Sequence, residues 1–198
     1  MTPGVHLYYN GEIDDGKGKI TKIRTHRARS FVKQFPQLLL GEFMGTIGTV
    51  SMRDTGNTLR STPYSGAMKT CITSGYNTGT SYSTHGLVIG SGSTSIDISQ
   101  YKLVTQIAHG SSAGQLNYGS MSTGAPNYDP DTGIMSVYFT RLFSNGSGGN
   151  VAVNEIGVYM RDSTSTWYFM LIRDVLTSTL NVPNGGTLTL RYTIKVVL

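Results

Sequence analysis

The sequence predicts an all-β protein whose main body is a β-sandwich or a jelly roll. From residue 46 onward, short runs rich in Thr, Val, Ile and Tyr alternate with clusters of Gly, Ser and Asn, which is typical of strands joined by turns. Charged residues make up only 14% of the chain and glycines number 25, whereas helix-rich proteins carry more Glu, Lys and Ala. A chain of 198 residues can bury one sizeable core, so we expect one principal domain.

Eight segments have the composition and length of strands. They span residues 46–52, 67–73, 86–89, 115–120, 134–143, 151–160, 167–176 and 187–198. In the last segment Leu188, Leu190 and Tyr192 alternate with polar residues, which predicts one buried and one wet face. The turn at 144–150 predicts a hairpin over residues 134–160, and strands without intervening helices favour two packed sheets.

One amphipathic helix is predicted over residues 30–45. The apolar residues that recur at the spacing of one helical face are Phe31, Val32, Phe35, Leu38, Leu39 and Phe43. Ser30 is the expected N-cap, and Gly41 or Gly45 is the expected end. Pro36 would kink this helix unless it lies in the first turn.

Residues 1–29 are predicted to form an extended basic arm with at most one edge strand. Residues 1–33 hold seven Lys and Arg against three acidic residues, a balance of +4, whereas the remainder holds nine against eight, a balance of +1. Such a stretch can bind phosphates, but no aromatic residue lies between Tyr9 and Phe31 to stack on bases. Docking on an acidic neighbouring subunit, or simple solvation, is therefore favoured over nucleic-acid binding.

We expect the arm (1–29) and the helix (30–45) to form an assembly interface, and the β-sandwich body (46–198) to fold without the arm. The residues expected at the interface are Lys22, Arg24, Arg27, Arg29, Phe31, Phe35, Leu38 and Leu39.

The sequence favours a non-enzymatic protein. Residues 110–114 (GSSAG) match the G-x-S-x-G pattern around Ser112, but no amphipathic helix follows, as a nucleophile elbow requires. Nothing marks a catalytic carboxylate pair among the eight acidic residues after residue 33. The single cysteine, Cys71, excludes an internal disulfide and a zinc site built from several cysteines, and we expect it to be a small buried side chain.

No metal or cofactor is expected. Asn127, Asp129 and Asp131 alternate as calcium ligands can, but Thr132 stands where a calcium loop needs Gly and Tyr138 where it needs Glu. A turn is the better interpretation, and calcium binding stays open. The four histidines lie far apart in sequence: His6, His26, His85 and His109.

Tyrosine is abundant, with 12 copies, and several fall in predicted loops: Tyr64, Tyr76, Tyr82 and Tyr128. Exposed tyrosines suit protein interfaces and sugar-binding surfaces, so they favour binding or assembly over catalysis. No apolar run approaches the ~18 residues of a membrane span, and no signal-peptide core is present, so we expect a soluble protein.

Several segments resemble structural proteins of tailed bacteriophages. Residues 153–159 (VNEIGVY) are similar to a strand motif of tail-fibre and collar-like domains. Residues 170–176 (MLIRDVL) and 182–194 (VPNGGTLTLRYTI) resemble the closing strands of phage virion proteins. The likeness extends to residues 86–92 (GLVIGSG) with Asp97, Tyr101, Lys102 and Leu103, and to residues 27–33 (RARSFVK).

The resemblance implies a non-enzymatic assembly role in a virion, without catalytic residues. The chain ends at Leu198 directly after a predicted strand, which favours a compact capsid decoration or minor capsid protein over a long fibre. A tail, baseplate or fibre component and a carbohydrate-binding receptor-recognition module are the alternatives. The expected partners are other virion proteins and further copies of the chain, in a homo-oligomer such as a trimer, within a virion made in a bacterial cytoplasm.

Overall fold

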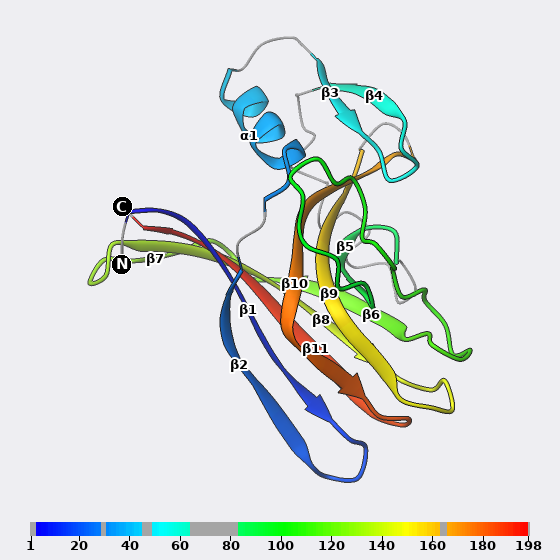
Figure 1. Ribbon diagram of the computed structural model, residues 1–198. Helices are drawn as coiled ribbons and strands as arrows, with labels where there is room; N and C mark the ends of the chain where they lie inside the picture. The colour runs from blue at the N-terminus through cyan, green and yellow to red at the C-terminus, as the bar shows by residue number, and fades with distance from the viewer. Residues whose placement is uncertain (1–2, 29–30, 45–48, 64–82, 163–165, 198) are drawn as a thin grey trace.

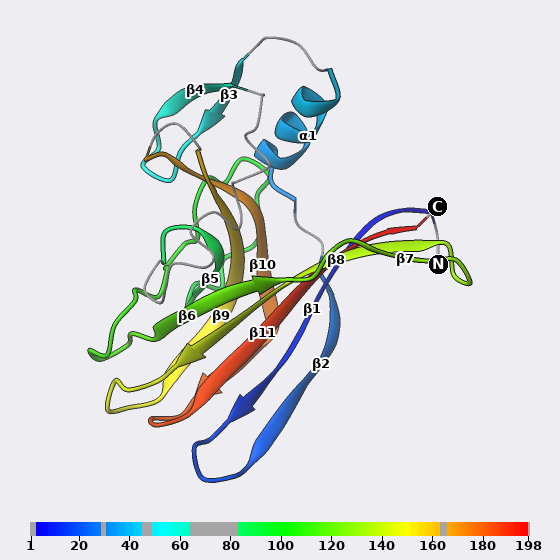
Figure 2. The same cartoon turned by 180° about the vertical axis from the view of Figure 1, so that it is seen from behind.

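The computed structural model describes residues 3–28, 31–44, 49–63, 83–162 and 166–197. These residues are mostly β-strand, arranged in antiparallel sheets, with one short helix, as the sequence predicts (Figures 1 and 2). The predicted strand at 67–73, with Cys71, lies outside them. Within the described residues, no helix is both long and apolar enough to span a membrane.

The larger sheet has the strand order β2-β1-β11-β8-β6, and the short β7 pairs with β8. Its strands are β1 (Gly4–Asp14), β2 (Ile20–Ala28), β6 (Asn117–Thr123), β7 (Asn127–Asp129), β8 (Ile134–Ser144) and β11 (Thr187–Val197). A three-stranded sheet has the order β10-β9-β5, from β5 (Gly86–Gly90), β9 (Val151–Arg161) and β10 (Tyr168–Val182). The hairpin of β3 (Thr49–Arg53) and β4 (Leu59–Pro63) lies beside α1 (Gln34–Met44) at one end (Figure 1).

The three-stranded sheet packs on one face of the larger sheet, and the core lies between them (Figure 1). In β11, Leu188, Leu190 and Tyr192 are buried while the residues between them are half-buried or exposed, which confirms the predicted alternation. Polar bonds also join the layers. The Tyr192 hydroxyl donates to Asp174 of β10, and the Arg141 guanidinium of β8 donates to the carbonyls of His85 and Leu87, at 3.1 Å each.

The hairpin predicted over residues 134–160 is wrong. β8 pairs with β11 and β6, whereas β9 pairs with β10 and β5, so the turn after β8 crosses from one sheet to the other. The turn before β11 crosses in the same way, because the apolar faces of consecutive strands must meet in the core. Asn145 ties the two crossings together: its Nδ2 donates to the carbonyls of Gly149 and Val182, at 2.8 and 2.7 Å.

The predicted extended arm is instead a β-hairpin that belongs to the large sheet. β1 pairs with β11 along its whole length, from Gly4 opposite Val197 to Asp14 opposite Thr187. The sequence carries the reason, because Leu7 and Tyr9 alternate with polar residues and are buried in the core. The body therefore does not begin at residue 46, because the hairpin is part of it.

Turn chemistry at the tip makes this hairpin possible. Asp15 Oδ1 accepts the backbone N–H groups of Lys17 and Lys19, at 2.8 and 3.0 Å. These backbone bonds, with a smaller contribution from the two lysine charges, hold the pKa of Asp15 below its usual value. Gly16 and Gly18 adopt positive φ values of 73° and 94°, which side chains rarely tolerate.

The helix begins at Gln34, so Pro36 lies in its first turn and leaves it unkinked. The expected N-cap, Ser30, lies outside the described residues and four positions before the helix begins. Leu38 is fully buried in the core of the chain itself. The Phe31 and Phe35 rings stack with centroids 4.0 Å apart and pack against that core.

The hairpin predicts a contrast between two apolar truncations. Leu7 is 2% exposed and Ile20 is 56% exposed. We expect Leu7→Ala to lower the free energy of unfolding by about 2–4 kcal/mol, because it leaves a cavity between β1 and the core. Ile20→Ala should change it by less than about 0.5 kcal/mol. Urea denaturation measures both, and equal effects would contradict the placement of β1 in the core.

Candidate assembly interface

The outer face of the large sheet, which points away from the core, gathers basic side chains from two strands, β2 and β11. We call this set the basic face: Lys22, Arg24, Arg27, Arg191 and Lys195. Strand register brings them together, because β1 lies between β2 and β11. Glu12 of β1 is opposite Lys22 of β2 on one side and Thr189 of β11 on the other. Glu12 is thus an acidic neighbour within a face of five cations, and the surface as a whole is electropositive.

Several of these cations are held in place by neighbours on the same face. The Arg191 guanidinium lies 4.4 Å from the centroid of the Tyr138 ring, and its Nε donates to the Thr140 hydroxyl at 3.4 Å. The Lys195 ammonium lies 5.2 Å from the centroid of the Tyr8 ring. Such contacts restrict long side chains before a partner arrives, which lowers the entropic cost of binding.

A groove of about 490 Å³ runs across this face between β2 and β8. Its lining residues are Asn10, Gly11, Glu12, Lys22, Ile23, Arg24, Thr25, Thr140, Thr189 and Arg191. The lining combines cations with hydroxyl and amide groups, so the groove suits an anionic and hydrogen-bonding partner.

The structure brings together only part of the predicted interface. Lys22, Arg24 and Arg27 share the basic face, and Arg27 Nη2 lies 2.8 Å from Nδ1 of His6. Arg29 lies outside the described residues.

The helix residues of the predicted interface do not join the basic face. Leu38 is buried inside the chain, and Phe31, Phe35 and Leu39 are half-buried, so the apolar helix face packs mainly on the body of the same chain. The prediction missed Arg191 and Lys195, which come from the opposite end of the sequence and reach the site only through β1–β11 pairing.

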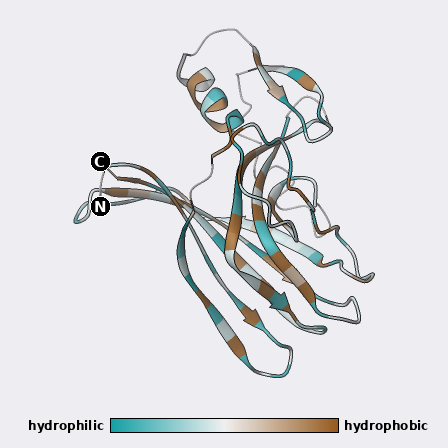
Figure 3. Cartoon of the chain, in the orientation of Figure 1, coloured by the Kyte–Doolittle hydropathy of each residue, from teal (hydrophilic) through white to brown (hydrophobic). Residues whose placement is uncertain are grey.

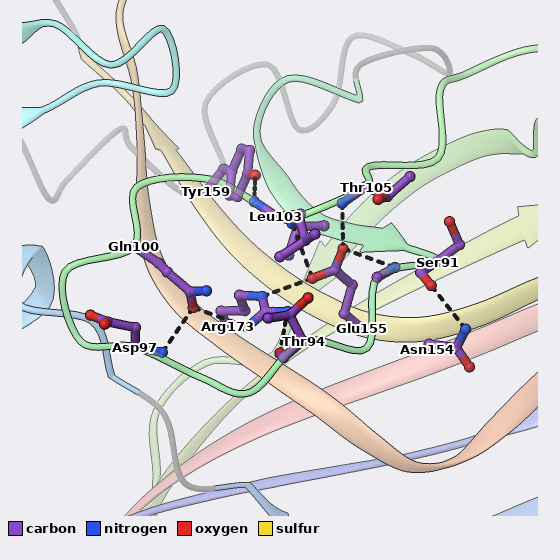
Figure 4. Close-up of polar contacts among 12 residues, drawn as sticks. Ser91, Thr94, Asp97, Gln100, Leu103, Thr105, Asn154, Glu155, Tyr159 and Arg173 are labelled. Carbon is purple, nitrogen blue, oxygen red and sulfur yellow. Dashed lines mark hydrogen bonds and ion pairs between the residues drawn. The ribbon is translucent and has the colours of Figure 1, made fainter.

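A second polar cluster lies within the small sheet and is closed to solvent (Figure 4). Arg173 Nε of β10 lies 2.7 Å from Glu155 Oε2 of β9, and both side chains are 0% exposed. Arg173 also donates to Gln100 Oε1 at 2.9 Å and to the Thr94 carbonyl at 3.0 Å. The ion pair is therefore hydrogen-bonded on both sides, as a buried pair must be.

The carboxylate of Glu155 serves as an acceptor for backbone that forms no strand. It accepts the N–H groups of Gly92, Val104 and Thr105, at 3.2, 3.2 and 2.9 Å. The Tyr159 hydroxyl accepts the N–H of Leu103, and the Asn154 amide donates to the Ser91 carbonyl at 2.9 Å (Figure 4). Together these bonds fix the irregular segment 91–105 on the small sheet.

Close approach explains the glycines at the start of this segment. A Cβ on Gly92 would lie 2.6 Å from Glu155 Oε1, and one on Gly90 would lie 2.5 Å from the same atom. The sequence signal for the cluster was an acidic residue inside the apolar run 151–160 and an arginine inside 170–176. Because both side chains are inaccessible to solvent, this cluster positions backbone and does not contact a substrate.

The other candidate residues occupy ordinary structural positions. Ser112 is exposed in a loop followed by strand β6, so the helix of a nucleophile elbow is absent after it. Asp129 accepts the Thr132 hydroxyl at 2.6 Å and the Asp131 N–H at 3.1 Å, and these bonds lower its pKa. Among the described residues, no group of three His, Cys, Asp or Glu is arranged to hold a metal ion. Of the loop tyrosines, Tyr128 is 51% exposed and the other three lie outside the described residues.

Comparisons with protein-family models, with curated proteins and with solved structures find no match for this chain.

The buried ion pair predicts that its partners depend on each other. Glu155→Gln should lower the free energy of unfolding by about 3–5 kcal/mol, because it leaves the Arg173 charge buried and uncompensated. The exposed Glu12→Gln should change it by less than about 0.5 kcal/mol. Removing both charges in Glu155→Gln/Arg173→Met should cost less than the sum of the single variants. Additive losses in chemical denaturation would show that the pair is not coupled.

Buried tyrosines predict a loss of stability at alkaline pH. Burial raises the pKa of Tyr118 to about 12 and the pKa values of Tyr159 and Tyr192 well above their usual value. Above pH 10 the unfolded state loses phenolic protons that the folded state keeps, so stability falls as pH rises, by about 1.4 kcal/mol per pH unit for each such tyrosine.

Absorbance at 295 nm should show fewer phenolates at pH 11 before unfolding than after it. Tyr118→Phe should reduce the slope of unfolding free energy against pH between pH 10 and 12. An unchanged slope would show that folding does not raise the pKa of Tyr118.

Proposed function

We propose that this chain is a non-enzymatic structural component of a tailed-phage virion that docks on a neighbouring subunit through its basic face. The observation that carries the proposal is the basic face itself, since it combines cations on two strands, β2 and β11, with side chains that hold Arg191 and Lys195 in place. The described polar cluster with the strongest interactions, around Glu155 and Arg173, is closed to solvent. The basic face is accessible to a partner, whereas the buried polar cluster is not. This combination suits assembly better than catalysis.

The segments that resemble phage virion proteins support the proposal by where they meet. Residues 153–159 supply Glu155, residues 170–176 supply Arg173, and residues 86–92 supply the glycines that approach Glu155. Three of the segments that carry the likeness thus meet in one structural unit, the small sheet with its buried ion pair.

We propose a β-sandwich with jelly-roll-like connections as the finer description of the fold. Two antiparallel sheets stack over one core, and the turns after β8 and β10 each pass from one sheet to the other. Connections of this kind are typical of double-sheet architectures.

Within a virion, a capsid decoration or minor capsid role is our first choice. The β1–β2 hairpin replaces the free arm as the docking element, and its partner is an acidic surface of a capsid subunit. A tail, baseplate or fibre component uses the same chemistry on a different neighbour. The protein would then be made in the bacterial cytoplasm and end in the particle.

A carbohydrate-binding receptor module is the second candidate, and the groove on the basic face favours it. Its hydroxyl, amide and cationic lining is able to hydrogen-bond an acidic saccharide. A glycan array separates the two roles, because the structural role requires no saccharide binding.

Charge reversal tests the proposed role. Lys22→Glu/Arg24→Glu should weaken co-sedimentation with phage capsids or tails at least about tenfold, which corresponds to ~1.4 kcal/mol. Wild-type binding should itself fall as salt rises, because the contact is electrostatic. The matched control, Lys102→Glu/Arg161→Glu, makes the same charge change at exposed positions outside the basic face. If both double variants bind equally, or if the wild type binds neither particle, the proposal fails.

A further inference from the structure

The core-facing side of the large sheet continues beyond the sheet that covers it. The ends of β1, β11 and β8, with β7, project past β10, β9 and β5, and both termini of the chain lie there (Figures 1 and 2). Figure 3 shows hydrophobic residues on these projecting ends. The strands therefore present core-type side chains where the described small sheet no longer covers them.

Strand register places four of these side chains in one row on the core-facing side. Val5 is opposite Val196, Val196 is opposite Met135, and Met135 is opposite Tyr128. We call this set the uncovered row. Val5, Met135 and Tyr128 are 46%, 44% and 51% exposed. In the next row inward Leu7 is only 2% exposed, and Ile194 and Val137 are half-buried, so exposure falls toward the covering sheet.

The two ends of the row differ in shape and charge. Beyond Tyr128, Asp129 ends β7, and the turn that follows carries the exposed Asp131. At the other end, Val5 lines a hollow of about 390 Å³ together with His6, Leu7, Arg27, Ala28 and Phe31. One end thus offers an exposed ring beside an acid, and the other a hollow with a mixed polar and apolar lining that includes the Arg27 cation.

We propose that the uncovered row binds a second copy of this chain about a two-fold axis. Consider a two-fold axis that passes between Val196 and Met135. The uncovered row of the second copy then lies against that of the first in the opposite order. This arrangement sets Tyr128 of each copy against the Val5 hollow of the other, and the acidic turn of each copy beside Arg27 of the other. The surface is then complementary to itself in shape and charge, which an isologous interface requires.

The size of the surface sets the strength of this contact. Neighbouring strands lie about 4.8 Å apart, so four strands span only ~15 Å. A stable interface buries roughly 800 Å² on each partner, and the row with its two ends falls at or below that value. The dimer is therefore concentration-dependent, and a crowded assembly would favour it.

Sedimentation velocity on the isolated chain, over a range of concentrations, tests the proposal. The mass should rise from 21.4 kDa toward twice that value. Met135→Lys should raise the dissociation constant at least about tenfold, because it buries an unpaired charge in the contact. Leu142→Lys is the matched control: it lies on the same strand with 43% exposure, close to the 44% of Met135, but on the opposite face of the sheet, and should leave the dimer unchanged.

Cross-linking tests the geometry. In a Cys71→Ser background, we mix a Val5→Cys chain with a Tyr128→Cys chain and add a copper–phenanthroline oxidant. The two-fold arrangement predicts more disulfide-linked dimer in the mixture than in either chain alone, since Val5 faces Tyr128 of the other copy.

Three results would overturn the proposal: a mass of 21.4 kDa at every concentration up to about 200 µM, a dimer that survives Met135→Lys, or a mass three times that of the chain. None of these experiments uses a phage particle, so their failure is distinct from failure of the proposed virion role.

Discussion

Burial of the Glu155–Arg173 ion pair is the constraint around which the small sheet and its covering segment are built. Removing two charges from water costs several kcal/mol for each ion, and their attraction offsets this only when the remaining donors and acceptors are also satisfied. Here the satisfaction comes from the irregular segment 91–105, through backbone N–H groups to Glu155 and acceptors for Arg173. The segment and the ion pair therefore stabilise each other, because neither has complete hydrogen bonding without the other.

The parts of the fold that follow from local periodicity were predictable from the sequence. Strands such as 134–144, 151–161 and 187–197 have alternating or continuous apolar runs, and the structure confirms them with small changes at their ends. Pairing was not predictable in the same way. The turn at 145–150 has hairpin composition, but its strands join different sheets because tertiary burial, not the turn, decides which edges meet.

The N-terminal segment shows a second limit of reasoning from composition. Its basic and glycine-rich sequence indicates an arm. In the structure β1 pairs with β11 over eleven residue pairs, and Leu7 and Tyr9 are buried on the core-facing side of β1. For the same reason, only part of the predicted set of cations could be placed on one face from the sequence. Lys22, Arg24 and Arg27 are close in sequence, whereas Arg191 joins them only through long-range pairing, for which a single sequence carries no signal.

The presence of cations on β2 can also be explained without a docking partner. Edge strands often carry Lys or Arg to prevent pairing with other sheets, and β2 lies at the end of the large sheet. Edge protection does not account for Arg191 and Lys195, because β11 is an interior strand paired on both sides. Arg191 and Lys195 lie over the Tyr138 and Tyr8 rings, so the positive charge is spread over the face of the sheet and is not confined to its edge. A charged face presents a surface to which a partner can bind.

The uncovered row lies on the other side of the same sheet, so both contacts can form at once. Arg27 is the exception, since it lies on the basic face and also beside the Val5 hollow, and it would couple the two contacts electrostatically.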